Sequence, residues 1–541
     1  FQDDYHVTSK LVLNLGLRWE TTLPPVEEKD RWSDFSPTTP NPAAGNLLGA
    51  LIYAGTGTGR QGSRALADSW FAGFGPHIGF AYSLNDKTVV RANYARSFGP
   101  IQTVSGSTHQ RGFTQTFSFS NSNGGLTPTF LLNQGLPPWP QPPFISPSFA
   151  NKDNIPWWQG QEATRAPEDN NFNISIQRQL TGSLALEVAY NAVMGSHLQS
   201  DLLNYDQLNP IYLAKYGYNL LNQKYNSPAA VAAGIVAPYP NFAKDWGSGA
   251  TVARALRPYP QYQSIDTFNG EGDHSGHSTY HAGMIRLEKR YSSGLVFETS
   301  YVFSKLLTDA DSYWGNGAFN GNTQGAMDQY NRRLEKSIGQ FDVTHNFKWG
   351  GSYELPFGKG KQWMNSGPLA YVLGNWRVSG IAVYQSGIPI PLGTSFGLPL
   401  FNSRLAPYVT SYDGWRAPYS GKFDPSVDNF FVPYGTGPFP LQGKDASGNL
   451  IPGYSSFGNA TRFNPKVRLP WNLNENVALA KEIPIREHLR FEIRAEAFNL
   501  FNRVRFGSGS QQLQDPNFGH LTSNDEINTP RELQLAAKLY F

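Results

Sequence analysis

Residues 531–541, RELQLAAKLYF, alternate between apolar and polar side chains up to the aromatic carboxy-terminus. With a period of two, one side of an extended strand collects Leu533, Leu535, Ala537, Leu539 and Phe541, and the other side collects Glu532, Gln534, Ala536, Lys538 and Tyr540. A tilted strand needs roughly 9–11 residues to cross the hydrocarbon of a bilayer, and an aromatic ring at its end is stable at the interface. A soluble edge strand can alternate in the same way, so the interpretation depends on whether the pattern recurs upstream.

The same alternation recurs in earlier pairs of segments. Residues 11–20 show it most clearly, because an apolar residue occupies every second position from Leu11 to Trp19. We predict strand pairs at residues 1–5 and 11–20, 74–84 and 87–98, 171–180 and 183–193, 280–291 and 295–307, 341–354 and 376–384, and on both sides of the turn at 483–488. With the last stretch these make about thirteen strands, and the last strand has no predicted partner.

The connections between these strands alternate in length. A short turn joins the two strands of each pair, whereas long loops join the pairs at residues 21–73, 99–169, 198–278, 308–339, 387–473 and 502–530. Outer-membrane barrels have short periplasmic turns and long extracellular loops, whereas a propeller repeats four strands per blade at a near-constant period. The sequence therefore predicts an all-β fold, a transmembrane antiparallel β-barrel.

The composition supports a large all-β body and excludes several classes of function. The 541 residues include 54 glycines, 39 prolines and 14% aromatic residues, and no stretch approaches the ~18 consecutive apolar residues of a membrane helix. The absence of cysteine excludes disulfide scaffolds and thiol catalysis. The net charge is +3 with both signs interspersed, so nothing favours nucleic acid as a partner. Because the chain starts at Phe1 without a signal peptide, we interpret it as a mature or truncated piece.

Several motifs resemble the carboxy-terminal barrel of TonB-dependent outer-membrane receptors, most closely the Oar-like subgroup. They are residues 1–5 (FQDDY), 13–20 (LNLGLRWE), 330–333 (YNRR) before Phe341 and Asp342, 498–502 (FNLFN), and the final Phe541. The resemblance implies that residues 1–541 are the carboxy-terminal part of a barrel of about 22 strands, with the plug domain and the TonB-contacting segment outside this chain.

The resemblance also implies partners. They are outer-membrane lipid, a TonB-type energy-coupling protein reached through the missing amino-terminal segment, and an extracellular ligand. Iron chelates, cobalamin and glycans are the best-known substrates of the family, and Oar-like members are associated with traffic of peptides or proteins. The sequence does not choose among these ligands.

Two runs of alternating charge are candidates for the wall of a solute path through the barrel. Facing an aqueous lumen, they suit contact with an anionic solute. The alternative is a self-neutralising wall that packs against the plug. The two runs are Arg286, Glu288 and Arg290, and Arg490, Glu492, Arg494 and Glu496.

Aromatic side chains in the long loops are candidates for contact with an extracellular ligand. Flat rings suit sugars and peptides, and they equally suit packing between loops. The candidates are Trp139, Trp157, Trp158, Trp246 and Trp314, with Tyr313 beside the last.

One cluster of histidines has the residue types of a zinc site but not the spacing. His274, His277 and His281 lie near Glu271 and Asp273. Residues four apart on a strand are about 13 Å from one another, whereas the ligands of one zinc ion converge within a few ångströms. We therefore predict no metal site here.

The remaining motifs predict neither catalysis nor a cofactor. Asp309 and Asp311 lack the other ligands of a calcium loop. Residues 358–361 (GKGK) lack the first glycine and the final Ser or Thr of a phosphate loop. No nucleophile elbow or metalloprotease motif is present in the sequence. We therefore expect a protein that is not an enzyme.

Three functions remain as hypotheses. The first is an outer-membrane receptor barrel for TonB-dependent passage of a bulky solute, glycan, peptide or protein. The second is a structural or adhesive surface barrel without energised transport. The third, a secreted β-sandwich or propeller enzyme, requires a convergent pair of carboxylates that the sequence does not suggest. The first two place the protein in the bacterial outer membrane.

Overall fold

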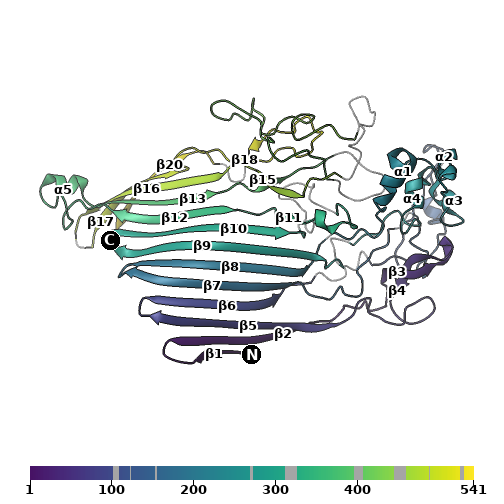
Figure 1. The fold of residues 1–541 in the computed structure, drawn as a ribbon, viewed down its shortest axis with the longest axis horizontal. Coiled ribbons are helices and arrows are strands. Elements are labelled where there is room, and N and C mark those ends of the chain that lie inside the picture. The colour runs from purple at the N-terminus through teal and green to yellow at the C-terminus, as the bar shows by residue number, and fades with distance from the viewer. Residues whose placement is uncertain are drawn as a thin grey trace.

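The predicted strands join in one antiparallel sheet in the computed structural model of the protein (Figure 1). The structure describes residues 1–101, 109–121, 123–152, 155–200, 202–267, 272–310, 326–394, 406–443, 458–486, 488–523 and 529–541. The order of strands across the sheet is β1, β2, β5, β6, β7, β8, β9, β10, β12, β13, β16, β17 and β20, and the short β11 pairs with β10. This path has the predicted number of strands.

Nearly every strand of the path begins and ends close to its predicted position. The bounds are Gln2–His6 (β1), Leu11–Thr22 (β2), Trp70–Asn85 (β5), Thr88–Phe98 (β6), Glu168–Thr181 (β7), Leu184–Leu198 (β8), Gly276–Ser292 (β9), Leu295–Thr308 (β10), Ser337–Ile338 (β11), His345–Glu354 (β12), Trp376–Gln385 (β13), Asn472–Pro484 (β16), Arg490–Phe498 (β17) and Glu532–Tyr540 (β20). β12 starts at His345 and not at Phe341, because the Asp342 carboxylate accepts a hydrogen bond from the Leu306 amide at 2.7 Å and pairs with Arg468.

The terminal strand has a partner, so the prediction of an unpaired strand is wrong. β20 pairs antiparallel with β17, with Phe491 opposite Leu539 and Glu492 opposite Lys538. The sequence hides this pairing because the long connection 499–531 separates the two strands. In the part of the chain that the structure describes, the path ends at β1 and β20, and neither pairs with a further strand.

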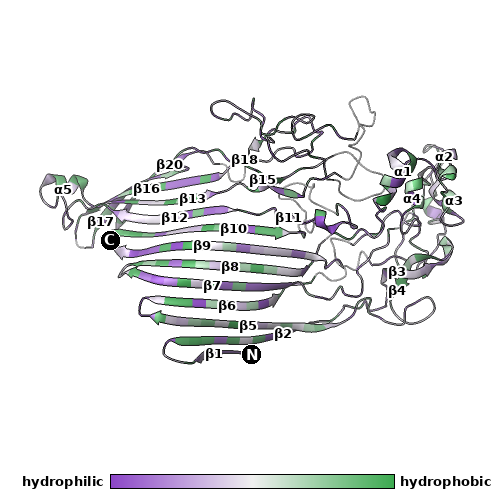
Figure 2. Ribbon diagram, viewed as in Figure 1, coloured by the Kyte–Doolittle hydropathy of each residue, from purple (hydrophilic) through white to green (hydrophobic). Residues whose placement is uncertain are grey.

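One face of the sheet is apolar and uncovered. Leu535 is 82% exposed, Leu15 and Trp349 are also exposed, and Phe491 is half-buried between its strand neighbours. Apolar and polar segments alternate along the strands in Figure 2. An apolar face of this extent suits contact with lipid, and we call it the lipid-facing side.

The other face of the sheet is polar. Cross-strand partners on this face include Asn93 opposite Asn173 and Gln177 opposite Glu187. Since side chains of one strand alternate between the two faces, the same strands present apolar residues to lipid and polar residues to the barrel interior. We call this face the lumen side.

The two ends of the sheet differ in the length of their connections (Figure 1). At one end the strands are joined by residues 7–10, 86–87, 182–183, 293–294, 355–375 and 485–489. At the other end they are joined by residues 23–69, 99–167, 199–275, 309–344, 386–471 and 499–531, which together we call the loop cap. By the rule for outer-membrane barrels, the loop cap is extracellular and the short turns are periplasmic.

The loop cap contains secondary structure that the sequence did not suggest. Residues 21–73, which we predicted as an irregular loop, contain the hairpin of β3 (Ser33–Asn41) and β4 (Leu47–Tyr53). Helices α1 (Ile211–Leu221), α2 (Pro228–Ala232), α3 (Phe242–Trp246) and α4 (Val252–Ala255) lie between β8 and β9. The last two long connections contain the short strands β14 (Pro389–Pro391), β15 (Phe463–Arg468), β18 (Phe506–Gly507) and β19 (Thr522–Ser523).

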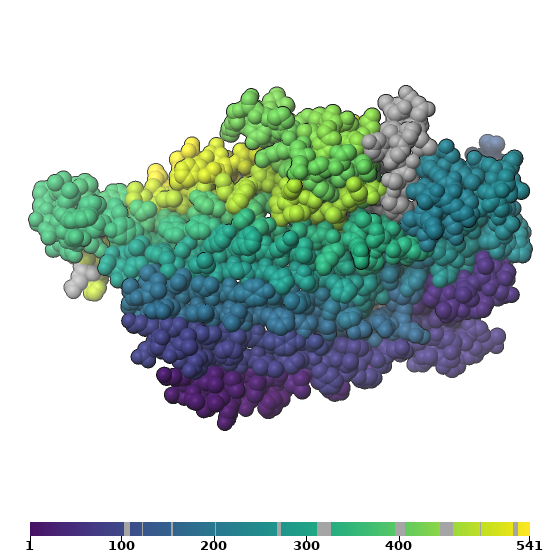
Figure 3. Space-filling model, in the orientation of Figure 1, coloured from purple at the N-terminus to yellow at the C-terminus, as the bar shows by residue number. Residues whose placement is uncertain are grey.

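The hydrophobic core lies in the loop cap and not against the sheet. Among the described residues, the largest fully buried side chains all belong to the cap. Phe430, Phe431, Phe439 and Phe518 form the centre of the biggest cluster, and the Phe431 and Phe518 rings stack with their centroids 5.2 Å apart. The cap forms the bulky right-hand part of the molecule in Figure 3. No helix among the described residues combines the length and the apolar character that crossing a membrane requires.

Candidate functional site

The lumen side gathers the first predicted run of charges into one ion-pair cluster. Arg286 of β9 donates from Nε to Glu298 of β10 at 2.9 Å. Its guanidinium also lies 3.3 Å from Glu288 and 3.8 Å from Glu187 of β8. Arg290 lines the same recess, whose volume is about 300 Å³. Three carboxylates thus surround one guanidinium, and a second arginine lies beside them.

The second predicted run forms a similar cluster on β17. Arg494 lies 3.3 Å from Glu496 and 3.6 Å from Glu492. Glu492 is buried and also pairs with Arg377 of β13 at 3.1 Å. Arg490, at the first position of β17, lies 3.8 Å from a carboxylate of β16. The two runs do not form one site, because β10, β12, β13 and β16 separate β9 from β17 in the sheet.

A half-open pocket lies in the loop cap beside β3 and β4. Its volume is about 530 Å³. Trp158 and Tyr205 line it, with their rings in a T-shaped contact at a centroid distance of 4.7 Å. The residues Gln61 and Gln161 line it as well. Aromatic rings beside side-chain amides offer flat contact and both hydrogen-bond donors and acceptors to a sugar or a peptide.

Asp34 places a buried carboxyl group in the wall of this pocket. Its Oδ1 accepts a hydrogen bond from the Gln159 amide at 3.0 Å and lies 3.7 Å from Nδ1 of His109. Burial raises the pKa of the Asp34 carboxyl to about 6, and the nearby His109 opposes that shift. The group therefore changes its charge in the mildly acidic range.

The tryptophans predicted as ligand contacts do not gather in one place. Trp158 lines the pocket. The neighbouring Trp157 accepts a hydrogen bond at its carbonyl from the Phe35 amide at 2.8 Å, which holds its backbone against β3. Trp139 packs elsewhere, with its ring centroid 6.3 Å from that of Phe119. Trp314 and Tyr313 lie outside the described residues.

Trp246 has two contacts within the helical part of the cap. Its Nε1 donates to the Tyr239 hydroxyl at 3.0 Å, and the Arg254 guanidinium lies 3.7 Å from its ring centroid. The guanidinium stacks on one face of the Trp246 ring, and the hydrogen bond is at the edge of the ring. Trp246 therefore joins α3 to α4.

The three predicted histidines have separate surroundings. His274 lines the pocket, His277 lies 3.9 Å from Asp309, and Nδ1 of His281 shares a hydrogen bond with the Tyr190 hydroxyl at 2.7 Å. Among the described residues, no group of three or more His, Asp or Glu side chains is arranged to hold a metal ion. Glu271 and Asp311 lie outside the described residues.

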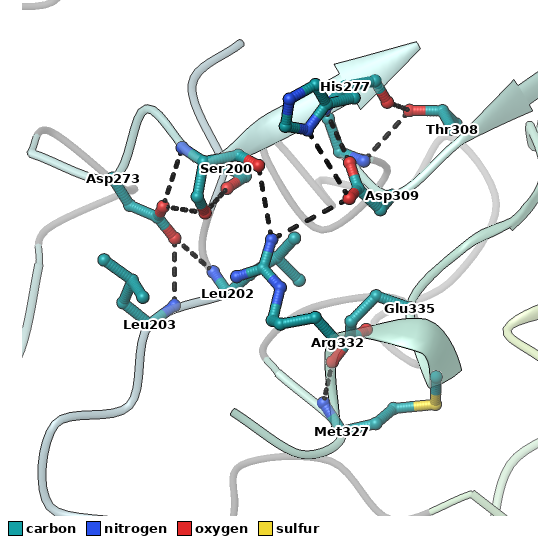
Figure 4. A network of polar contacts seen from close by, with 12 residues as sticks. Ser200, Leu202, Leu203, Asp273, His277, Thr308, Asp309, Met327, Arg332 and Glu335 are labelled. Carbon is teal, nitrogen blue, oxygen red and sulfur yellow. Dashed lines mark hydrogen bonds and ion pairs between the residues drawn. The ribbon is translucent and has the colours of Figure 1, made fainter. Parts of the chain in front are cut away.

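The acidic residues near these histidines hold the backbone of the cap (Figure 4). The Asp273 carboxylate accepts hydrogen bonds from the amides of Leu202 and Leu203 at 2.6 and 2.9 Å. Asp309 accepts one from the His277 amide at 2.6 Å, and its carboxylate lies 3.9 Å from Arg332. Asp273 therefore joins the two ends of the connection 199–275, and Asp309 joins the connection 309–344 to the start of β9.

Sequence reasoning missed most of the residues that form the pocket. Phe35, Gln61, Gln159 and Tyr205 come from segments far apart in the chain. No spacing links them, because only the folded β3–β4 hairpin brings them together. The alternation of Ser33–Asn41 is broken by prolines and a register shift, so no signal was available for the hairpin itself.

Comparison with solved structures returns outer-membrane receptors. The pyoverdine receptor FpvA from Pseudomonas aeruginosa is 10% identical with a TM-score of 0.38, and the match covers 100% of this chain and 41% of FpvA. The ferric-catecholate import receptor Fiu from E. coli is 11% identical with a TM-score of 0.36, covering 100% and 44%. The ferric citrate transporter FecA is 10% identical with a TM-score of 0.35, covering 98% and 43%. The chain thus spans about two fifths of the length of these receptors.

Comparison with protein families gives a match over almost the whole chain. Residues 1–534 match the family described as outer membrane beta barrel domain. No curated protein sequence matches this one. The family agrees with the lipid-facing and lumen sides of the sheet and with the alternation of short turns and long connections. The protein therefore belongs to the outer membrane beta barrel domain family, which is a family of membrane barrels and not of enzymes, and its place is the bacterial outer membrane.

Proposed function

We propose that this chain is the carboxy-terminal part of a TonB-dependent receptor of the Oar-like subgroup. Its barrel would be completed by further strands and gated by a plug, and it passes a bulky solute, glycan, peptide or protein across the outer membrane. Energy comes from a TonB-type protein that contacts a segment preceding Phe1. The motifs at residues 13–20, 330–333 and 498–502 support this assignment.

The observation that carries the proposal is the width of the sheet. In the described part of the chain, the strands from β1 to β20 form one path, and its two edge strands do not pair with each other. Closure then requires more strands, and the interior of a barrel with many strands is too wide for side chains to fill. A wide polar lumen has room for a large solute, and in the 22-stranded outer-membrane transporters a plug fills it.

The surfaces of the barrel support the same reading. The pocket beside Trp158 and Tyr205 lies in the loop cap and suits a first contact with the ligand. The clusters around Arg286 and Arg494 line the lumen side, where they suit either a solute path or a plug contact. In each cluster the central arginine lies within 4 Å of two or more carboxylates, so its own charge is largely neutralised.

Binding to TonB tests the proposal. The complete gene product, purified in detergent, is mixed with the periplasmic domain of TonB from the same organism, and the complex is isolated by affinity capture. We expect a one-to-one complex that is lost when the residues preceding Phe1 are removed. No complex with the complete protein, together with no plug sequence before Phe1, would overturn the proposal.

The structural or adhesive barrel is the second candidate. One observation favours it: the loop cap has hydrophobic clusters of its own, so it presents a firm surface at the extracellular end. This candidate predicts binding to a surface partner without any requirement for TonB. Ligand binding that is unchanged in cells without TonB, and no uptake in either strain, would favour it.

A further inference from the structure

One connection at the periplasmic end differs from the others. The neighbouring turns consist of residues 86–87, 182–183 and 293–294, whereas residues 355–375 join β12 to β13 and contain helix α5 (Pro368–Leu373). The helix projects beyond the strand ends at the left of Figure 1 and forms a separate knob in Figure 3. A turn between adjacent antiparallel strands does not require such a segment.

The α5 segment exposes large apolar side chains. Tyr371 is 77% exposed and Leu369 is 58% exposed, and Trp363, Met364 and Val372 are exposed as well. The segment 355–375 contains two lysines and neither aspartate nor glutamate. Exposed apolar residues gathered in this way mark a surface that another apolar phase covers.

Hydrogen bonds fix the end of α5 to the lipid-facing side of the sheet. Lys481 of β16 donates from Nζ to the carbonyls of Tyr371 and Gly374 at 2.8 and 2.6 Å. Trp376 of β13 donates from Nε1 to the Val372 carbonyl at 3.0 Å. Because a cation at the last carbonyls of a helix satisfies acceptors that lack partners within the helix, Lys481 stabilises this attachment.

The attachment point is continuous with the lipid-facing side. Trp376 and Lys481 are opposite each other in the ladder, and the next pair on the same face is Val378 and Leu479, which are both exposed. The ammonium group of Lys481 lies 5.3 Å from the Trp376 ring centroid. A tryptophan and a lysine at the end of a membrane strand are typical of the level of the headgroups.

From these contacts we propose that residues 363–373 form an interfacial anchor in the periplasmic leaflet of the outer membrane. Leu369, Tyr371 and Val372 contact the boundary between headgroups and acyl chains. The exposed Lys359 and the lack of acidic residues suit a surface of phospholipid phosphates. The covering phase is lipid, because the apolar surface of α5 continues that of β13 and β16.

Fluorescence quenching by brominated lipid tests this proposal. The chain has no cysteine, so Tyr371→Cys introduces a single site for an environment-sensitive fluorophore. Leu535→Cys serves as a control within the lipid-facing side, and Asp86→Cys serves as a control in a short turn at the same end. The complete protein is inserted into vesicles of phosphatidylcholine and phosphatidylglycerol, with or without brominated acyl chains.

The three labelled variants give distinct results. We expect brominated lipid to quench the labels at positions 371 and 535 but not the label at position 86, and aqueous iodide to quench the label at position 86 most strongly. The emission of the label at 371 should shift to shorter wavelength when the protein enters the vesicles. A label at 371 that responds like the one at 86 would overturn the proposal. The proposal would also be overturned if the label at position 371 were protected from iodide only after periplasmic proteins are added.

Discussion

A charge introduced on either face of the terminal strand tests which face contacts lipid and which faces the lumen. Leu535 and Gln534 are adjacent in β20 and point to opposite faces. Leu535 lies opposite Ala495 near the middle of the strand, whereas Gln534 lies opposite Glu496. We compare Leu535→Arg with Gln534→Arg, because the two variants introduce the same side chain at neighbouring positions.

The expected destabilisation follows from the surroundings of each residue. An arginine facing lipid at the bilayer midplane costs about 2–4 kcal/mol, and the lost contact between leucine and hydrocarbon adds about 1.5–3 kcal/mol. Leu535→Arg should therefore lower the free energy of unfolding by about 3.5–7 kcal/mol. Gln534→Arg places the charge near Glu496 on the lumen side and should change it by less than about 1 kcal/mol.

Equilibrium unfolding of the protein in lipid vesicles measures this difference. Guanidinium titration is followed by tryptophan fluorescence and by the mobility of the unboiled protein in SDS gels. The two unfolding midpoints should differ clearly, with Gln534→Arg close to the wild type. Equal destabilisation by both variants, or a larger effect of Gln534→Arg, would refute the assignment of the two faces.

Two further predictions concern the loop cap. Glu335 and Arg462 form a fully buried ion pair, and Glu335 also accepts a hydrogen bond from the Met327 amide at 2.6 Å. Because Arg462→Met leaves the Glu335 charge buried without its partner, this variant should destabilise the cap by about 3–5 kcal/mol. The double variant, with Arg462→Met and Glu335→Gln, should destabilise the cap less than Arg462→Met alone. Equal sensitivity of the single and double variants to protease would contradict this. Burial raises the pKa of Asp34 from 3.8 to about 6, so the folded cap holds that proton more tightly than the unfolded chain, and the contribution of this group to stability is greatest below about pH 4. This contribution should fall by about 3 kcal/mol in all as the pH rises from about 4 to about 7, measured by hydrogen exchange of β3 and β4. The Asp34→Asn variant is the control that lacks this loss, and a wild type whose pH dependence equals that of the control would contradict the assignment.

The membrane part of the fold was predictable because the bilayer imposes a strict pattern. A strand with lipid on one side and water on the other must alternate, and residues 11–20 and 531–541 therefore reveal both their strand and their faces. The turns at 86–87 and 182–183 are equally local signals. The pairing of β20 with β17 was not predictable in this way, since a long connection carries no information about register.

The loop cap was not predictable, because long-range packing decides it. The β3–β4 hairpin lacks alternation, and α1–α4 are short helices held by clusters such as the one around Leu221 and Val252. Of the predicted aromatic candidates that the structure describes, only Trp158 lines the pocket, and its neighbour Tyr205 is distant in the sequence. The charge runs were found from their period, but only the folded sheet shows that Arg286 and Arg494 belong to separate clusters.

Accessibility along β20 tests the division of the sheet into two faces most directly. A nitroxide spin label is placed at each position from 532 to 540, one at a time, in the complete protein in lipid vesicles. Collisions with oxygen, which concentrates in lipid, are compared with collisions with a water-soluble nickel complex. We predict a period of two, with oxygen favoured at 533, 535, 537 and 539 and nickel favoured at the positions between them. A profile without this period, or with the two reagents exchanged, would contradict a sheet that faces lipid through Leu535 and water through Gln534.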